Sequence, residues 1–130
     1  MPPHDEPTLL TAEPQLFVEN IETASTFYVD RLGFELVFSY GQPPFYAQLE
    51  RGGARLNLRS VDGPVFADGF RARNADALAA TVTVHGIKEL FSAYAANGVA
   101  WHQKLRREPW GTRTFIVRDP EGNLIAFAGA

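Results

Sequence analysis

The chain has 130 residues, 45% of them hydrophobic, which is enough for one globular domain with a single core. It contains no cysteine, which excludes disulfides, iron–sulfur clusters, thiolate zinc sites and cysteine nucleophiles. Its 12 Lys and Arg against 15 Asp and Glu give a net charge of −3, whereas nucleic-acid-binding proteins carry a basic excess, so we expect no nucleic-acid partner.

The N-terminal residues 1–7 are acidic and proline-rich, unlike the basic and then apolar opening of an export signal. The longest apolar stretches fall far short of the ~20 residues that cross a bilayer. We therefore expect a cytoplasmic protein with no membrane partner.

Residues 13–60 predict one unit of five elements. Ala24 and Tyr28 have helical spacing, Asn20 is a suitable N-cap and Gly33 a suitable C-cap. Alternating apolar residues on either side of this helix predict strands. In order, we expect a strand at 15–18, a helix at 22–31, and strands at 34–38, 45–50 and 54–59.

Residues 61–77 contain Gly63-Pro64 and Gly69, and predict a connector with little regular structure. Residues 78–130 then repeat the order of elements, with Gly98 ending the helix and a strong turn at 119–123. The elements expected are a strand at 79–84, a helix at 87–97, and strands at 99–105, 112–118 and 124–128.

The two halves also share identities at an offset of 66 residues: Val18 with Val84, Ile21 with Ile87, and Tyr28 with Tyr94. Internal repetition of this kind indicates duplicated structural units. The shared order of elements predicts a single α+β domain over residues 1–130. In it, two β-α-β-β-β modules form curved mixed sheets around a cleft.

Motifs of the common catalytic classes are absent from the sequence: there is no phosphate-binding glycine loop, zinc-protease helix or serine-hydrolase elbow. The three histidines, His4, His85 and His102, are far apart, and none has the spacing of a local metal pair. His85 is expected in a turn, whereas His102 fits either a cleft or an ordinary strand position.

Aromatic residues are the more informative candidates. Phe38, Tyr40, Phe45 and Tyr46 cluster around a Pro-Pro turn. Trp110 lies in a Pro-Trp-Gly loop, and loops bury little. A tryptophan in such a loop either covers a hydrophobic gap or offers a stacking face to a ligand, and the residues alone leave both interpretations open.

Two segments resemble a known family. Residues 107–123, REPWGTRTFIVRDPEGN, are similar to the C-terminal signature of bleomycin resistance proteins, and residues 24–34, ASTFYVDRLGF, to the N-terminal helix signature of the same group. These proteins belong to the vicinal oxygen chelate superfamily, with glyoxalase I and the extradiol dioxygenases. The resemblance extends from about residue 13 to the end of the chain and implies paired β-α-β-β-β modules.

The resemblance also implies where a metal would be held in the enzymes of the superfamily. The corresponding positions here are Glu13, Asn57, Ala79 and Ala126. Only Glu13 is a good ligand, whereas catalytic metal sites normally need three or more protein ligands. We therefore expect no metal, no cofactor and no enzymatic activity.

The function implied by the resemblance is antibiotic resistance by drug binding. A metal-free homodimer would sequester a bleomycin-like drug or another aromatic small molecule in crevices between its subunits. The acidic net charge would suit a cationic ligand. The expected ligand-binding residues are Phe38, Phe45, Tyr46, Asn57, Trp101, Trp110 and Gly111.

Two alternatives stay open at this point. One is a metal-dependent enzyme of the glyoxalase or dioxygenase type that uses Glu13 with further ligands. The other is a binding domain for an unrelated metabolite, in which the aromatic residues serve only as core.

Overall fold

The structure, a computed structural model, describes residues 6–130, so His4 lies outside the described residues. Its elements in the first half are β1 (Gln15–Val18), α1 (Ile21–Thr26), the π-helix η1 (Phe27–Arg31), β2 (Glu35–Tyr40), β3 (Tyr46–Arg51) and β4 (Ala54–Ser60). Those in the second half are α2 (Phe70–Arg73), β5 (Ala80–Thr83), α3 (Ile87–Ala96), β6 (Trp101–Arg107), β7 (Arg113–Arg118) and β8 (Leu124–Gly129).

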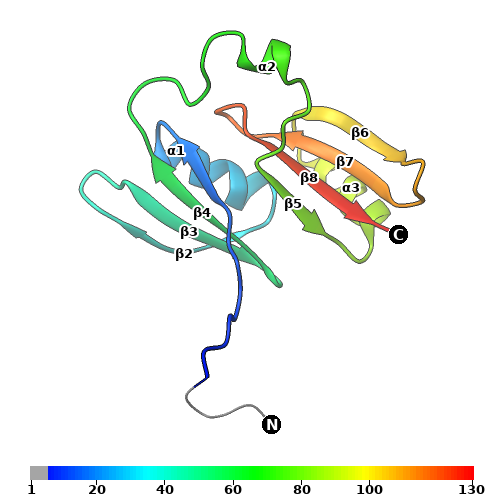
Figure 1. Ribbon diagram of the computed structural model, residues 1–130, viewed down its shortest axis with the longest axis horizontal. Coiled ribbons are helices and arrows are strands. Elements are labelled where there is room, and N and C mark those ends of the chain that lie inside the picture. The colour runs from blue at the N-terminus through cyan, green and yellow to red at the C-terminus, as the bar shows by residue number, and fades with distance from the viewer. Residues whose placement is uncertain (1–5) are drawn as a thin grey trace.

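The strands form two four-stranded sheets with the same topology. The first sheet has the order β1-β4-β3-β2 and the second β5-β8-β7-β6. In each sheet the first strand runs parallel to the last, and the other pairs are antiparallel. The α+β fold of two β-α-β-β-β modules with curved mixed sheets is confirmed, and Figure 1 shows the two sheets side by side. Among the described residues, no helix is long and apolar enough to cross a membrane.

Local signals set the ends of the first helix. The Asn20 side chain accepts a hydrogen bond of 2.8 Å from the Thr23 backbone N–H, which confirms the predicted N-cap. The helix begins at Ile21, and its second half is a π-helix rather than the expected α-helix. Gly33 follows with φ +75°, a conformation that glycine adopts without strain.

The connector has little regular structure, as predicted, and its one helix over residues 61–77 is the single turn α2, which tertiary contacts support because Arg71 donates to the backbone carbonyl of Gly122 at 3.1 Å. One strand boundary in the second half was predicted wrongly. The strand expected from residue 99 begins at Trp101 instead. The backbone N–H of Val99 donates to the carbonyl of Tyr94, so this residue closes the C-terminal end of α3, which stops at Ala96.

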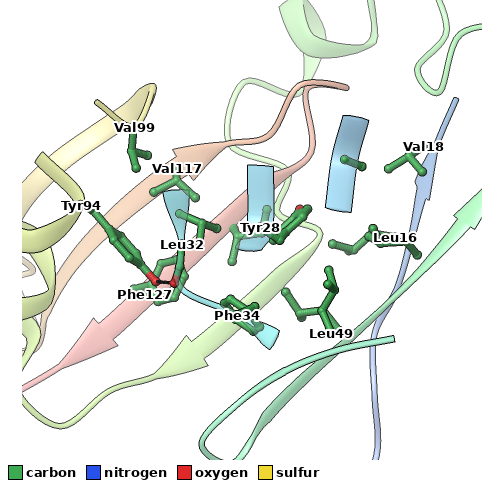
Figure 2. Close-up of a cluster of buried hydrophobic side chains, with 14 of the residues drawn as sticks. Leu16, Val18, Tyr28, Leu32, Phe34, Leu49, Tyr94, Val99, Val117 and Phe127 are labelled. Carbon is green, nitrogen blue, oxygen red and sulfur yellow. Dashed lines mark hydrogen bonds between the residues drawn. The ribbon is translucent and has the colours of Figure 1, made fainter. Parts of the chain in front are cut away.

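One hydrophobic core joins the two modules. Leu16, Val18 and Leu49 pack in the same cluster as Tyr94, Val117 and Phe127, and all six are at most 2% exposed. Figure 2 shows this cluster, with Leu32 and Phe34 between the two groups. Because the helices and both sheets contribute to the same core, the modules are held as one unit.

Polar contacts between the modules follow the internal repeat. The hydroxyl of Tyr28 donates to Asp119 in the second module at 2.9 Å, and that of Tyr94 donates to the Leu32 carbonyl in the first at 2.7 Å. Arg31 and Asn97, which are also 66 residues apart, each donate to the other's backbone carbonyl. The offset in the sequence therefore corresponds to an approximate two-fold relation between the helices.

The buried Tyr28 hydroxyl makes stability sensitive to alkaline pH. Burial, with the nearby Asp119 carboxylate, raises the pKa of Tyr28 well above its usual value of 10. Above pH 10 the unfolded chain loses this proton while the folded chain keeps it, so folding stability falls as pH rises. Between pH 10 and 11, the free energy of unfolding should fall by up to ~1.4 kcal/mol more in the native protein than in Tyr28→Phe.

Urea unfolding of both proteins from pH 8 to 11 measures this difference. The other titrating groups are common to both proteins, so their contributions cancel in the comparison. If the free energies of unfolding of the two proteins fell equally as pH rises, the Tyr28 hydroxyl would not cause the loss of stability.

Candidate functional site

The first sheet has one covered and one open face. Leu16 of β1, Leu49 of β3 and Leu58 of β4 face α1 and belong to the core. Because side chains alternate along a strand, Phe17 and Tyr46 lie on the opposite face, together with Asn57. Figure 1 shows α1 behind β4, so this open face is free of helices.

Four aromatic side chains on β2, on β3 and in the turn between them form what we call the aromatic patch: Phe38, Tyr40, Phe45 and Tyr46. The rings of Phe38 and Tyr46 are 5.9 Å apart, and those of Tyr40 and Phe45 are 5.6 Å apart. Tyr40 is 68% exposed and Phe38 45%. Sequence reasoning placed these residues together correctly.

Phe17 was missed as a candidate, although it is 48% exposed and lies on the open face. The signal was present in the sequence, because Phe17 stands between two core residues of a short strand. Strand alternation places it on the face opposite to both neighbours. The open face thus offers more apolar surface than the predicted site.

Asn57 belongs to a closed polar network. Its side-chain amide donates to Glu13 at 3.0 Å, and Gln48 donates to the Asn57 carbonyl oxygen at 3.2 Å. The other carboxylate oxygen of Glu13 accepts from Arg55 at 3.2 Å. The only carboxylate of the four superfamily metal positions is therefore already neutralised by a guanidinium.

The remaining two metal positions offer no donor side chain. Ala126 packs with Ile116 and Leu124 in a small apolar cluster, and Ala79 precedes β5. No group of three or more His, Asp or Glu side chains suited to a metal ion occurs within residues 6–130. The residues at these positions do not fit a divalent metal, which needs several anionic or imidazole ligands.

The structure separates the two tryptophans. Trp101 is partly buried and packs against Phe91 of α3 and the core residue Phe115, with ring centroids 4.7 and 5.5 Å away. Trp110 is 73% exposed, and no aromatic ring pairs with it among residues 6–130. Of the two interpretations of Trp110, an exposed face fits its surroundings and a cover over a hydrophobic gap does not.

Glu108 holds the loop that carries Trp110 and Gly111. Its carboxylate accepts hydrogen bonds from Arg106 at 2.9 Å and from the Thr114 hydroxyl, and Glu108 is only 7% exposed. Its backbone N–H donates to Thr112, and its carbonyl accepts from Gly111. The Arg106 guanidinium, followed by the Thr114 hydroxyl, lowers the pKa of Glu108 below its usual value. Trp110 is therefore exposed on a loop that is held at both of its ends.

His102 interacts with a loop and a neighbouring strand. Its Nε2 lies 2.8 Å from the Asp76 carboxylate, and its Nδ1 lies 3.4 Å from the Arg118 guanidinium. The Arg118 contact requires Nδ1 to accept, which assigns the proton to Nε2. His102 therefore ties the connector to β6.

A cavity of about 810 Å³ lies between the modules. It is bounded by the β3–β4 hairpin, β5 and α3, and its lining includes Phe34, Leu90 and His85. None of the seven predicted ligand-binding residues lines it. Of these residues, Asn57 is buried in its polar network and Trp101 packs against the core, whereas the other five are at least partly exposed.

The aromatic patch and the Trp110 loop lie far apart in one chain. Figure 1 shows the turn between β2 and β3 at one end of the long axis of the molecule and the loop between β6 and β7 at the other. A single chain therefore cannot bring Phe45 and Trp110 onto the same small ligand.

Comparison with known proteins gives the relationships of this chain. The model of the Glyoxalase/Bleomycin resistance protein/Dioxygenase superfamily matches residues 10–127. Bleomycin resistance proteins from Geobacillus stearothermophilus and Staphylococcus aureus are 32% identical over 130 residues, which cover 92% of this chain and 96% of each relative.

Solved structures show the same fold. TioX from Micromonospora sp. ML1 superposes with a TM-score of 0.71 and 27% identity, over 90% of this chain and 95% of that chain. The bleomycin-binding protein from bleomycin-producing Streptomyces verticillus, complexed with copper(II)-bleomycin, gives 0.73 and 24% identity, over 96% of this chain and 99% of that chain. The similarity thus extends over nearly the whole length of each protein.

Proposed function

Because this chain belongs to the glyoxalase/bleomycin resistance protein/dioxygenase superfamily, we propose that it is a metal-free binding protein of the bleomycin resistance type. In this proposal it acts in the cytoplasm and sequesters an aromatic small molecule. The ligand is a bleomycin-like drug or another aromatic compound. The names of its relatives support drug sequestration, since two are bleomycin resistance proteins and one solved neighbour holds copper(II)-bleomycin.

The observation that carries the proposal is the pair of exposed aromatic surfaces. Trp110 is 73% exposed at one end of the molecule, and the aromatic patch is exposed at the other. Flat ligands bind well between two aromatic faces, where stacking adds about 0.5–1.5 kcal/mol per pair beyond the burial of apolar area. A two-fold homodimer would set the Trp110 loop of one chain against the aromatic patch of its partner and form two equivalent crevices.

The polar residues favour binding over metal catalysis. Glu13 is engaged by Arg55 and Asn57, and alanine occupies Ala79 and Ala126. Superfamily enzymes need a divalent ion to polarise their substrate, and these side chains supply no such ligand set. We therefore do not carry the enzyme alternative further.

Titration of the intrinsic tryptophan fluorescence with metal-free and copper(II)-loaded bleomycin tests the proposal. A ligand that stacks on Trp110 should quench saturably near one drug per subunit, because Trp110 is one of only two tryptophans. Trp110→Ala should weaken binding at least ~10-fold, which corresponds to the loss of one stacking contact with its apolar burial. Free Cu²⁺ is the quenching control. Unchanged affinity in Trp110→Ala would place the ligand elsewhere.

Mixing two defective chains tests the shared crevice. Trp110→Ala and Phe38→Ala homodimers should each bind weakly, but a heterodimer of the two contains one crevice with both residues intact. Co-expressed and co-purified heterodimers should regain about half of the native binding capacity. If each chain held its own site, mixing would restore nothing. Sedimentation of the native protein as a monomer would also reject the crevice.

A further inference from the structure

The β6–β7 hairpin is strongly basic, although the chain as a whole is acidic. Between residues 101 and 118 it carries five basic side chains and a single acidic one, whereas the net charge of the protein is −3. The basic residues are Lys104, Arg106, Arg107, Arg113 and Arg118, and the acidic one is Glu108. The positive charge is therefore gathered on the element that carries the Trp110 loop.

Within residues 6–130, only Arg106 of these five basic residues forms an ion pair with a carboxylate, and two of the other four face each other across the hairpin. Glu108 is occupied by Arg106, so it does not neutralise a second arginine. Arg107 and Arg113 are directly opposite each other in the β6–β7 register, and no ion pair joins either of them to a carboxylate within residues 6–130. Like charges in directly opposite positions destabilise a sheet. The fold thus keeps an unfavourable pair that an anion would neutralise.

This pair adjoins the exposed tryptophan. Arg107 and Arg113 each lie three residues from Trp110, and three extended residues span at most ~11 Å. The turn between them is closed by the hydrogen bond from Glu108 N–H to the Thr112 carbonyl, at 2.7 Å. A ring on Trp110 and a charged substituent on the two guanidiniums can therefore belong to one small molecule.

We propose that Arg107, Arg113 and Trp110 form an anion-and-ring site whose ligand is an aromatic carboxylate or sulfonate. Two guanidiniums provide the planar donors that suit such oxygen anions, while the indole supports the ring. The inference rests on the proposed function and, of its ligands, selects aromatic compounds that carry an acidic group. It reverses the expectation of a cationic ligand, which took the net charge of the chain as a guide to the charge at the site.

Four naphthalene compounds with the same ring test this inference: 2-naphthalenesulfonate, 2-naphthoate, neutral 2-naphthalenemethanol and cationic 2-naphthylmethylammonium. Binding is followed by the two tryptophan indole N–H signals in ¹H–¹⁵N spectra, which Trp110→Phe assigns. We expect both anions to shift the Trp110 signal with at least ~10-fold higher affinity than the alcohol, and the cation to bind weakest. The sulfonate and carboxylate arms distinguish the two acid groups. The preference should shrink from 0.05 to 0.5 M salt, because screening weakens charge attraction.

Arginine variants test whether Arg107 and Arg113 cause the preference for anionic compounds. The double variant Arg107→Gln/Arg113→Gln should bind the four compounds alike, whereas Lys88→Gln, which removes a charge from α3, should keep the anion preference. The double variant should melt no lower than the native protein, because a repulsive pair is removed. An unchanged preference, or a shift of the Trp101 signal alone, would overturn the inference. So would a change of oligomeric state in the double variant, because the arginines would then serve a subunit contact.

The outcomes separate this inference from the proposed function. If all four compounds shift the Trp110 signal equally, Trp110 binds aromatic rings and only the acidic preference is wrong. If none shifts it at millimolar concentration, the anion-and-ring site is refuted, while the bleomycin titration of Trp110 decides the proposed function separately.

Discussion

Asp119→Ala is expected to lower the free energy of unfolding by about 3–4 kcal/mol, because several buried donors would lose their acceptor together. The carboxylate of Asp119 accepts from the Tyr28 hydroxyl at 2.9 Å and from the backbone N–H groups of Glu121 and Asn123 at 2.9 and 2.8 Å. It also accepts from the Asn123 side-chain amide at 3.0 Å. Each orphaned buried group costs about 1–3 kcal/mol, and two or more would be orphaned here.

Urea unfolding of Asp119→Ala, Asp119→Asn and Tyr28→Phe measures the effect. Asp119→Asn keeps one acceptor oxygen and should lose less than Asp119→Ala, while Tyr28→Phe removes a single hydrogen bond and should lose about 1 kcal/mol. If Asp119→Ala were no less stable than Tyr28→Phe, the turn at residues 119–123 would not depend on this carboxylate.

Replacing each tryptophan by alanine should produce opposite phenotypes. Trp101→Ala should lower the free energy of unfolding by about 3 kcal/mol, since it opens a cavity between Phe91 and Phe115. Trp110→Ala should change it by less than about 0.5 kcal/mol, because 73% of Trp110 is exposed. When each variant is measured in its folded state, Trp110→Ala should lose more ligand affinity than Trp101→Ala.

Thermal and urea unfolding of the two variants, with Trp110→Phe as a control that keeps an aromatic ring, tests this contrast. The strongest contrary result would be a large destabilisation by Trp110→Ala. That would mean that Trp110 covers a hydrophobic gap, and the case for a stacking face would be lost.

The sequence by itself determined the elements and their order. The Asn20 cap, the glycine after the first helix and the turn before β8 are local chemistry, because each depends on one residue's preferred backbone angles and on hydrogen bonds a few residues away. The repeat at 66 residues and the signature around Trp110 indicated the family and the paired modules. The aromatic patch also followed from the sequence, since its members lie on adjoining strands and in the one turn that joins them.

Only the tertiary structure decided what each candidate residue faces. The β6 register shifts between Trp101 and Gln103 and again before Arg106, and each irregularity disturbs the alternation that assigns side chains to a face. Trp101 stands opposite the buried Val117 in the register and so packs against the core, although the sequence placed it with Trp110 among the ligand-binding residues. The same register places Arg107 directly opposite Arg113. The number of basic residues in this hairpin can be read from the sequence, but this cross-strand pairing cannot. Strand register is set by packing over the whole sheet, and no local pattern contains it.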